Sequence, residues 1–372
     1  MVKKFRILML VSIVILWLIS TATKIKYNGL IYGLDFGLYH PDGKLYTFRT
    51  LNLLGRSEIE AGNLVSSWYA EHAFKLKYFE PSSLFYDVHP LWQLYKPRVL
   101  YPILSVPFVA LFGIPGMLVI PALSMLIVLV SVILMGFKLK NENLAFVIAL
   151  LLSISPVVSR WMYANITDGL LTAITYIFVV SFLYVKKDSS FLALGILLVI
   201  LGSLTRVSLL QWLAICIGIY AANQKKNALV LGFTSVMMFI PSAIGNLETG
   251  VLPNEKSSSF FERPVQLLFS MFKVGFFEIG QLLVLDRILL CLLVLAIIVS
   301  VLNFSRISSK FFLLLLISLW ITGAVNGTIG VNFRYQLPLL PFIAYSLLDS
   351  FRLKFEFIKF GRGSHSVRNR KG

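Results

Sequence analysis

Repeated apolar runs of about 15–22 residues constrain this chain more than any other feature of its sequence. A helix of about 20 apolar residues spans the roughly 30 Å hydrocarbon core of a bilayer and satisfies its own backbone hydrogen bonds there. The composition agrees, because 14% of the 372 residues are charged, whereas soluble domains contain about 25%. We therefore expect an all-α polytopic membrane protein.

The positions of the charges orient the expected helices. With the N-terminus inside, the inner side carries 18 Lys and Arg and four acids, net +14, whereas the outer side carries 16 Lys and Arg and 13 acids, net +3. Such an excess is typical of the cytoplasmic side. The formal charge of +17 therefore reflects topology and does not require a nucleic-acid partner. We expect both termini in the cytoplasm.

The apolar runs predict about ten transmembrane helices in one domain, residues 1–351. A basic cytoplasmic tail, residues 352–372, follows and is expected to face anionic lipid. Two polar segments are predicted to be non-cytoplasmic loops, a long first loop over residues 24–116 and a second over residues 245–287.

Three segments need separate interpretation. Val99–Phe112 contains prolines and is expected to form an interfacial helix within the first loop. Leu144–Val158 is expected to cross as one helix. Pro264–Leu285 is apolar enough to cross but contains Lys273 and Glu278. We interpret it as interfacial or re-entrant, with a crossing helix as the alternative.

Ionisable side chains concentrate on the expected outer side. The stretch from Tyr27 to Arg98 holds seven of the 17 acidic residues and three of the four histidines. A charge at the bilayer centre costs about 3 kcal/mol or more, and the expected helix centres are nearly free of charge. Four further charges lie at outer helix ends or in short outer loops: Arg160, Asp168, Arg206 and Arg334.

Carboxylates and fixed cations at one membrane face suit a particular kind of chemistry. Cations stabilise a departing phosphate, and a carboxylate takes the proton from an attacking hydroxyl. The alternative for each single arginine is that its side chain snorkels to the interface without a chemical role.

Four short motifs occur in a fixed order between about Pro41 and Pro341. They are His40-Pro41-Asp42-Gly43-Lys44-Leu45-Tyr46, then Lys96 to Pro102 with Leu111-Phe112-Gly113, then Asn165 to Leu171 with Leu204-Thr205-Arg206, and finally Phe333 to Pro341. In this order they resemble the PDExxY, KPPLYY…LFG, TTDALL with LTK or LTR, and RYLLPLLP motifs of the GT-C membrane glycosyltransferases. That group includes protein O-mannosyltransferases and aminoarabinose or lipid-sugar transferases.

The resemblance implies a GT-C-like fold and a polyprenyl-phosphate-linked sugar donor. It places the catalytic carboxylate on Asp42, with Asp168 as its partner across the cavity. It gives donor-phosphate binding to four cations: Lys96, Arg98, Arg206 and Arg334. The second acid of the family motif is replaced by Gly43, which makes a metal-binding acidic pair doubtful. No metal ligand is assigned and no cofactor is certain, although a divalent metal stays open.

Each carboxylate also has a simpler interpretation. Asp42 lies in a Pro-Asp-Gly run, which is good turn chemistry by itself. Asp168 is alternatively a charge near the positive end of a helix dipole, with Thr167 as the helix cap. Asp35 is the second choice for a catalytic base.

The sequence predicts a membrane glycosyltransferase of the bacterial plasma membrane. It would move a sugar from the lipid-linked donor to a hydroxyl of a glycan, lipid or protein acceptor on the non-cytoplasmic face, with inversion. Two other classes remain as alternatives. A transporter or flippase of lipid-linked sugars predicts charges near mid-membrane, broken helices and short loops. A non-catalytic membrane scaffold predicts no dependence on Asp42.

Overall fold

A computed structural model describes residues 2–27, 42–72, 97–206, 208–248, 264–326 and 333–363, and all regular structure within these ranges is helical. The first half contains α1 (Val2–Tyr27), α2 (Gly43–Leu53), α3 (Glu58–His72), α5 (Leu100–Phe112), η3 (Ile114–Leu118), α6 (Val119–Leu139), α7 (Glu142–Ile154), α8 (Pro156–Tyr163) and α9 (Asp168–Tyr184). The second half contains α10 (Asp188–Thr205), α11 (Leu209–Ala221), α12 (Lys225–Glu248), α14 (Pro264–Leu285), α15 (Arg287–Leu302), α16 (Ile307–Asn326), η4 (Arg334–Leu339) and α17 (Leu340–Gly363).

Several of these helices have the length and composition of membrane spans. Five qualify within the described residues: Lys4–Lys24, Ile114–Leu139, Asp188–Thr205, Val265–Leu285 and Ile307–Ala324. Four apolar helices, α5, α9, α11 and α15, have 13–17 residues. At 1.5 Å per residue these reach about 20–26 Å, less than a bilayer core of about 30 Å. The fold is that of a helical membrane protein.

The expected single helix Leu144–Val158 is in fact two helices, so that prediction was wrong. α7 ends at Ile154, and α8 turns away from it by 70°. Pro156 explains the break, because it holds the preceding Ser155 in an extended conformation (φ −59°, ψ 122°) and is well suited to the first position of a new helix. Ser155 caps α8 by accepting a hydrogen bond from the backbone N–H of Val158 at 3.2 Å.

A buried aspartate ties this break to a second helix boundary. Asp286 is 2% exposed and lies between α14 and α15. Its carboxylate accepts hydrogen bonds from the Leu289 N–H at 2.9 Å, from the Val157 N–H at 3.0 Å and from the Ser155 hydroxyl. One side chain therefore satisfies the first turns of both α8 and α15.

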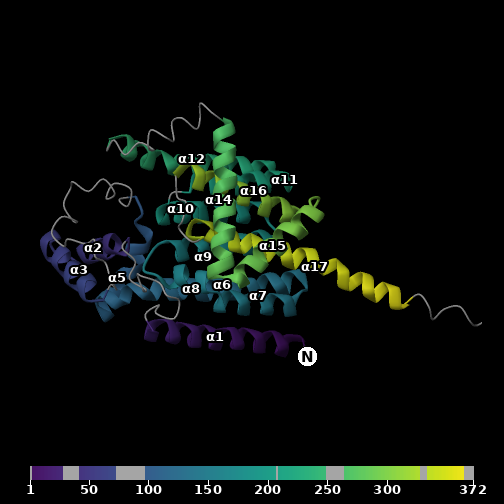
Figure 1. The fold of residues 1–372 in the computed structure, drawn as a ribbon, viewed down its shortest axis with the longest axis horizontal. Coiled ribbons are helices and arrows are strands. Elements are labelled where there is room, and N and C mark those ends of the chain that lie inside the picture. Colours follow the sequence, from purple (N-terminus) through teal and green to yellow (C-terminus); the bar gives the residue numbers. More distant parts are fainter. Residues whose placement is uncertain are drawn as a thin grey trace, which may run out of the picture.

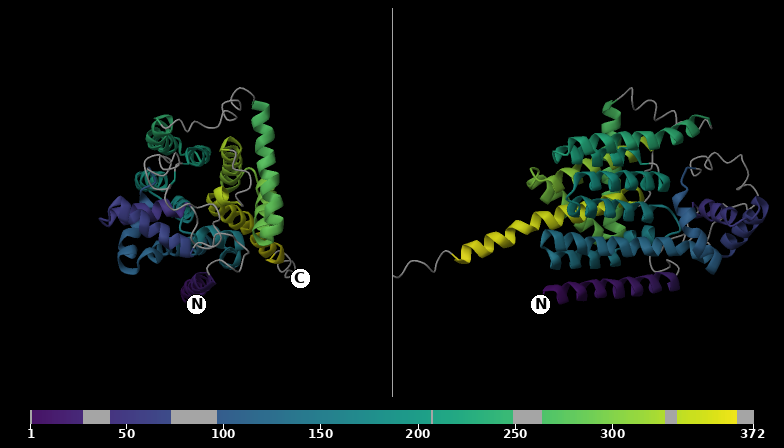
Figure 2. Two further views of the ribbon diagram at one scale, coloured as in Figure 1. Left: turned by 60° about the vertical axis from the view of Figure 1, so that its left-hand side comes forward. Right: turned by 180° about the vertical axis from the view of Figure 1, so that it is seen from behind.

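The long helices form a bundle with a distinct group of helices at one end. α2, α3 and α5 pack together there (Figure 1). The start of α1 and the end of α17 lie at the opposite end (Figure 2). α6 begins beside α5 and η3, and it packs against α1, α7 and α9, so it carries the contacts that join the two ends of the molecule.

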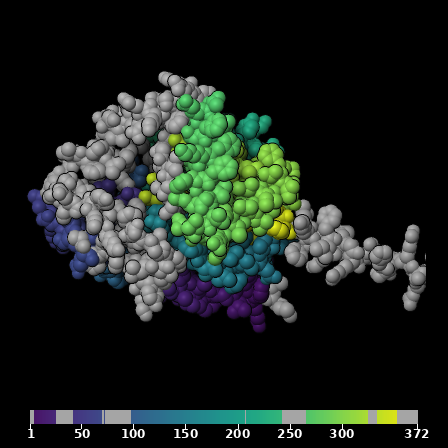
Figure 3. Space-filling model, in the orientation of Figure 1, coloured from purple at the N-terminus to yellow at the C-terminus, as the bar shows by residue number. Residues whose placement is uncertain are grey.

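The helix α14 differs in direction from the rest of the bundle. It runs across the other helices at a steep angle (Figure 1) and lies on the surface of the molecule (Figure 3). Phe269 and Phe276 on its outer face are 75% and 72% exposed. On its inner face Gly275 packs so closely against Trp320 of α16 that a Cβ atom there would lie 2.9 Å from the indole. α14 is thus held to the bundle by one face only.

Candidate functional site

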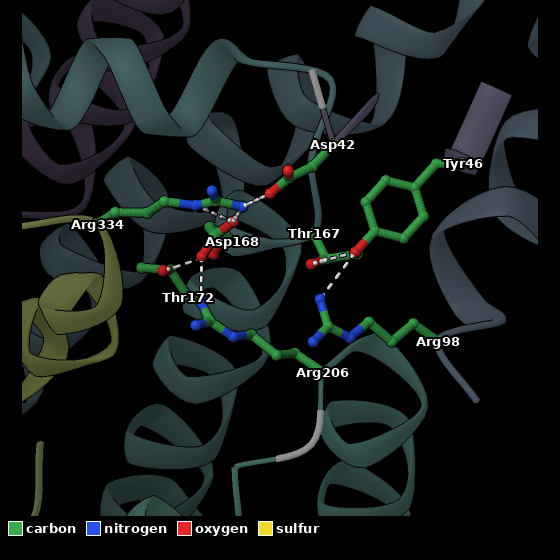
Figure 4. A network of polar contacts seen from close by, with 8 residues as sticks. All are labelled: Asp42, Tyr46, Arg98, Thr167, Asp168, Thr172, Arg206 and Arg334. Atoms are coloured by element: carbon green, nitrogen blue, oxygen red, sulfur yellow. Dashed lines mark hydrogen bonds and ion pairs between the residues drawn. The ribbon is translucent and has the colours of Figure 1, made fainter. Parts of the chain in front are cut away.

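Arg334 joins two carboxylates that are far apart in the sequence. Its Nη2 donates to Asp42 Oδ2 at 2.7 Å and to Asp168 Oδ2 at 3.1 Å, and its Nε donates to the same Asp168 oxygen at 3.1 Å (Figure 4). Arg334 and Asp42 are 292 residues apart. The two acids and one of the cations predicted from the sequence therefore meet at a single guanidinium.

A second arginine completes the pairing of Asp168. Arg206, the residue directly after α10, forms an ion pair with Asp168 Oδ1, so both carboxylate oxygens are used. The Asp168 side chain is 1% exposed, whereas the Asp42 side chain is 26% exposed. Asp168 is the buried anchor of the site, and Asp42 is the carboxylate that solvent or a substrate can reach.

Burial and charge act in opposite directions on the two arginines. Burial alone would lower the pKa of Arg334, but Asp168 and Asp42 outweigh it and hold the pKa well above its ordinary value. Burial lowers the pKa of Arg206, and Asp168 offsets this only in part. The Arg334 guanidinium is thus a permanent charge at the centre of the site.

Both carboxylates, those of Asp42 and Asp168, lie at the start of a helix. Asp42 is the N-cap residue of α2 and Asp168 is the first residue of α9, so the positive ends of two helix dipoles lie beside them. Neither Asp42 nor Thr167, the N-cap residue of α9, makes a side-chain cap hydrogen bond. Thr167 thus occupies the cap position expected of it, but its side chain does not make the capping hydrogen bond. Asp42 lies in a turn as its simpler interpretation expects, but its carboxylate reaches across to Arg334.

Tyr46 of α2 and Arg98, which lies two residues before α5, form another side of the site. Arg98 Nη1 donates to the Tyr46 hydroxyl at 3.3 Å, and that hydroxyl lies 3.3 Å from Thr167 Oγ1 (Figure 4). Burial raises the pKa of Tyr46, and the nearby Arg98 opposes this. The Tyr46 ring packs edge-on against Tyr101 with centroids 5.4 Å apart. Tyr46 thus both packs and takes part in the polar network, which its sequence alone did not indicate.

Two aromatic rings separate the arginines of the site. The Arg206 guanidinium lies 4.0 Å from the Tyr335 ring centroid, and Arg334 lies 5.6 Å from Tyr335 and 5.3 Å from Trp161. Arg160 lies 4.4 Å from the other partner, Trp161. Rings stacked on guanidinium faces are favourable and leave the N–H edges free to meet carboxylates. The only sequence signal for this arrangement is that an aromatic residue directly follows Arg160 and Arg334.

The presence of glycine at position 43, where the resembled motif has a second acid, has a steric explanation. A Cβ atom at Gly43 would lie 2.1–2.3 Å from the side-chain atoms of Asn165. Asn165 is fully buried, and its amide donates to the Tyr69 hydroxyl. An acid at position 43 therefore cannot stand beside Asp42, because Asn165 occupies that space.

This packing makes a direct prediction. Gly43→Ala should destabilise the protein by about 1–3 kcal/mol, because overpacking a filled interior forces side chains and backbone to shift. Thermal unfolding in one detergent would measure the effect. The double variant Gly43→Ala/Asn165→Gly should recover part of the loss, since the clash partner is then absent. Additive losses in the double variant would contradict the assigned contact.

The phenylalanine before Arg334 has an unusual backbone. Phe333 has φ 63° and ψ 11°, in the left-handed region, and is 1% exposed. A bulky residue there is an outlier, and such strain costs about 1–3 kcal/mol. The strained residue sets the direction in which Arg334 leaves the backbone toward the carboxylates.

Most of the predicted site residues come together, and two lie outside the part of the chain that the structure describes. Asp42, Asp168, Arg206 and Arg334 form one ion-pair network, and Arg98 approaches it through Tyr46. Lys96 and Asp35 lie outside the described residues. Within the described ranges, no group of three or more His, Cys, Asp and Glu side chains is arranged to hold a metal ion. The space between the two carboxylates is taken by the Arg334 guanidinium.

Comparison with known proteins gives no relative on which to base a function: no family model, no curated protein and no solved structure matches this chain.

Proposed function

We propose that this protein is a GT-C-like membrane glycosyltransferase that transfers a sugar from a polyprenyl-phosphate-linked donor to an acceptor hydroxyl. The observation that carries the proposal is the Asp42–Arg334–Asp168–Arg206 network at one end of an apolar bundle. It combines an accessible carboxylate with fixed cations, which is the pairing that the order of the four motifs led us to expect.

The cations of the site suit an anionic ligand. Arg206 and Arg334 pair with the two carboxylates, and Arg98 approaches the network through the Tyr46 hydroxyl. The starts of α2 and α9 add the positive ends of two helix dipoles. A lipid-linked phosphate has the complementary charge, and its polyprenyl tail matches the apolar surface of the bundle.

The proposed reaction is a single displacement. The acceptor oxygen forms a bond to the anomeric carbon of the sugar as the bond between that carbon and the phosphate oxygen breaks. The acceptor proton passes to Asp42, and polyprenyl phosphate leaves with the bonding electrons. Arginine side chains stabilise the charge that develops on the leaving phosphate. Attack opposite the leaving group inverts the anomeric centre.

The proposal includes a membrane orientation. α9 begins at Asp168 and α10 ends at Thr205, directly before Arg206, so the α9–α10 connection lies at the end of the bundle remote from the site. This connection carries Lys186 and Lys187, which supports a cytoplasmic position by the positive-inside rule. The site then faces the non-cytoplasmic side, with both termini in the cytoplasm, about ten spans, and the bacterial plasma membrane as its location.

One observation favours the transporter alternative. Glu278, in the apolar helix α14, is 3% exposed, and neither of its carboxyl oxygens has a hydrogen-bond partner. Buried carboxyl groups of this kind occur on ion pathways. Against it, the ion-pair network lies at helix ends, where a transferase needs it and where an alternating-access pathway does not concentrate its charges.

The purified protein in vesicles can separate the classes. We expect it to consume a polyprenyl-phosphate-linked sugar and to release polyprenyl phosphate only when an acceptor with a free hydroxyl is added. Movement of the intact donor between leaflets without bond cleavage would instead identify a flippase. If neither cleavage nor movement occurs with a panel of donors, the scaffold interpretation replaces both.

A further inference from the structure

A second polar contact lies beside the ion-pair network and takes no part in it. Glu278 of α14 has both carboxyl oxygens completely buried, and neither has a hydrogen bond of normal geometry. Gln336 of η4 is 1% exposed, lies against this carboxyl group, and has a buried Oε1 that also lacks a partner. The two residues thus carry three buried acceptor oxygens, and the Gln336 amide is the polar group that approaches the Glu278 carboxyl group.

The position of Glu278 makes this arrangement costly. On the inner face of α14, Met271, Val274, Glu278 and Leu282 follow one another at helical spacing, and the other three are apolar and buried. An apolar residue would pack there without penalty. An ionised carboxylate at such a place costs several kcal/mol unless it is paired. A group with that cost requires a physical reason.

One proton resolves the mismatch. A carboxylic acid at Glu278 has no charge and carries an O–H donor. The two ends of a glutamine amide exchange by a half-turn of the side chain, and structures assign them from hydrogen-bond partners. With Oε1 turned toward Glu278, the carboxylic acid donates and Gln336 accepts, so two of the three unmet acceptors are satisfied without any additional ligand.

We propose that Glu278 is a neutral carboxylic acid whose hydrogen bond to Gln336 positions Arg334 for the transfer reaction. Gln336 follows Arg334 by two residues in the same short helix η4. Gln336 contacts Glu278 of α14 while Arg334 pairs with Asp42 and Asp168, so the bond to α14 anchors η4 at a point separate from the carboxylates. Phe333 just before is strained, which makes an outside anchor useful. This inference rests on the proposed function for its effect on rate.

Glu278 variants can separate positioning from packing. Glu278→Gln keeps a neutral donor and should retain the wild-type kcat. Glu278→Met keeps the length and apolar packing but removes the hydrogen bond, so unfolding should occur at or above the wild-type temperature while kcat falls about 10- to 100-fold, as expected for a slightly misplaced catalytic group. KM for the lipid donor should change little. Lys273→Gln, on the exposed side of the same helix, is the control.

The protonation state has a readout that does not depend on activity. The infrared carbonyl band of a buried, hydrogen-bonded carboxylic acid should be present in the wild-type protein, absent from Glu278→Gln, and shifted in Gln336→Ala. Absence of the band from wild type, or wild-type kcat in Glu278→Met, would overturn the inference. If the wild-type protein shows the band but transfers no sugar, the proposed function is wrong. The protonated state of Glu278 then still holds, and its effect on the transfer rate does not.

Discussion

Replacing Arg334 with alanine should abolish sugar transfer and lower the free energy of unfolding by about 3–5 kcal/mol, because it leaves buried carboxylate charge without its partner. Asp168 is 1% exposed and would keep only Arg206, and Asp42 would lose the group that orients it. Thermal unfolding of both proteins in one detergent measures the stability loss, and the donor-cleavage assay measures the activity loss.

A matched control comes from another arginine ion pair in the same chain. Arg6 donates to Glu142 Oε1 at 2.6 Å, but their side chains are 40% and 22% exposed. Exposed pairs contribute about 0–1 kcal/mol, so Arg6→Ala should leave the unfolding temperature nearly unchanged. Equal losses in Arg6→Ala and Arg334→Ala would show that burial of the bridge does not matter.

Lysine at position 334 tests geometry separately from charge. A lysine keeps the positive charge but presents one ammonium group, whereas the guanidinium uses Nε and Nη2 on two carboxylates. We expect Arg334→Lys to recover much of the stability and little of the activity. Full activity in that variant would mean that the site needs only a charge, and the role given to the fixed bridge would be lost.

The features of this site that depend on local sequence were predictable. Charged residues at helix ends could be recognised, because an apolar run predicts where its helix begins and ends. The break at Ser155 had a visible signal in Pro156, and a strict reading of proline would have ended α7 there. The ion pairs could not be predicted in this way, because the arginine that meets Asp168 is decided by how η4, α9 and α10 pack in three dimensions.

The residues that escaped prediction act through packing. Trp161 and Tyr335 matter because their ring faces lie against guanidinium groups. No periodic pattern in the sequence predicts such a contact. Asn165 matters because it fills the space next to Gly43, a contact between residues far apart in the chain. Glu278 was visible as a lone acid in an apolar helix, but its neighbour Gln336 was not. Local chemistry was thus predictable and tertiary neighbours were not.

Asparagine at position 42 should slow transfer by about 10²–10⁴-fold, the usual contribution of a positioned general base. Asparagine has nearly the shape of aspartate, and its amide oxygen can still accept the hydrogen bond from Arg334 that Asp42 Oδ2 accepts at 2.7 Å. Because the Asp42 side chain is 26% exposed, the loss of its charge should leave abundance and the unfolding temperature near wild type. Donor binding, measured with the sugar-free polyprenyl phosphate, should also persist.

Comparison with Asp168→Asn shows which carboxylate takes the proton. Asp168 is buried and uses both oxygens on two arginines, so its amide variant should lose stability first, and any loss of activity should follow from that. A kinetic defect at full stability belongs to Asp42 alone. Asp188→Asn, at the far end of α10, should leave both properties unchanged. If Asp42→Asn transferred sugar at the wild-type rate, Asp42 would be a structural acceptor for Arg334, and the base would have to be sought elsewhere.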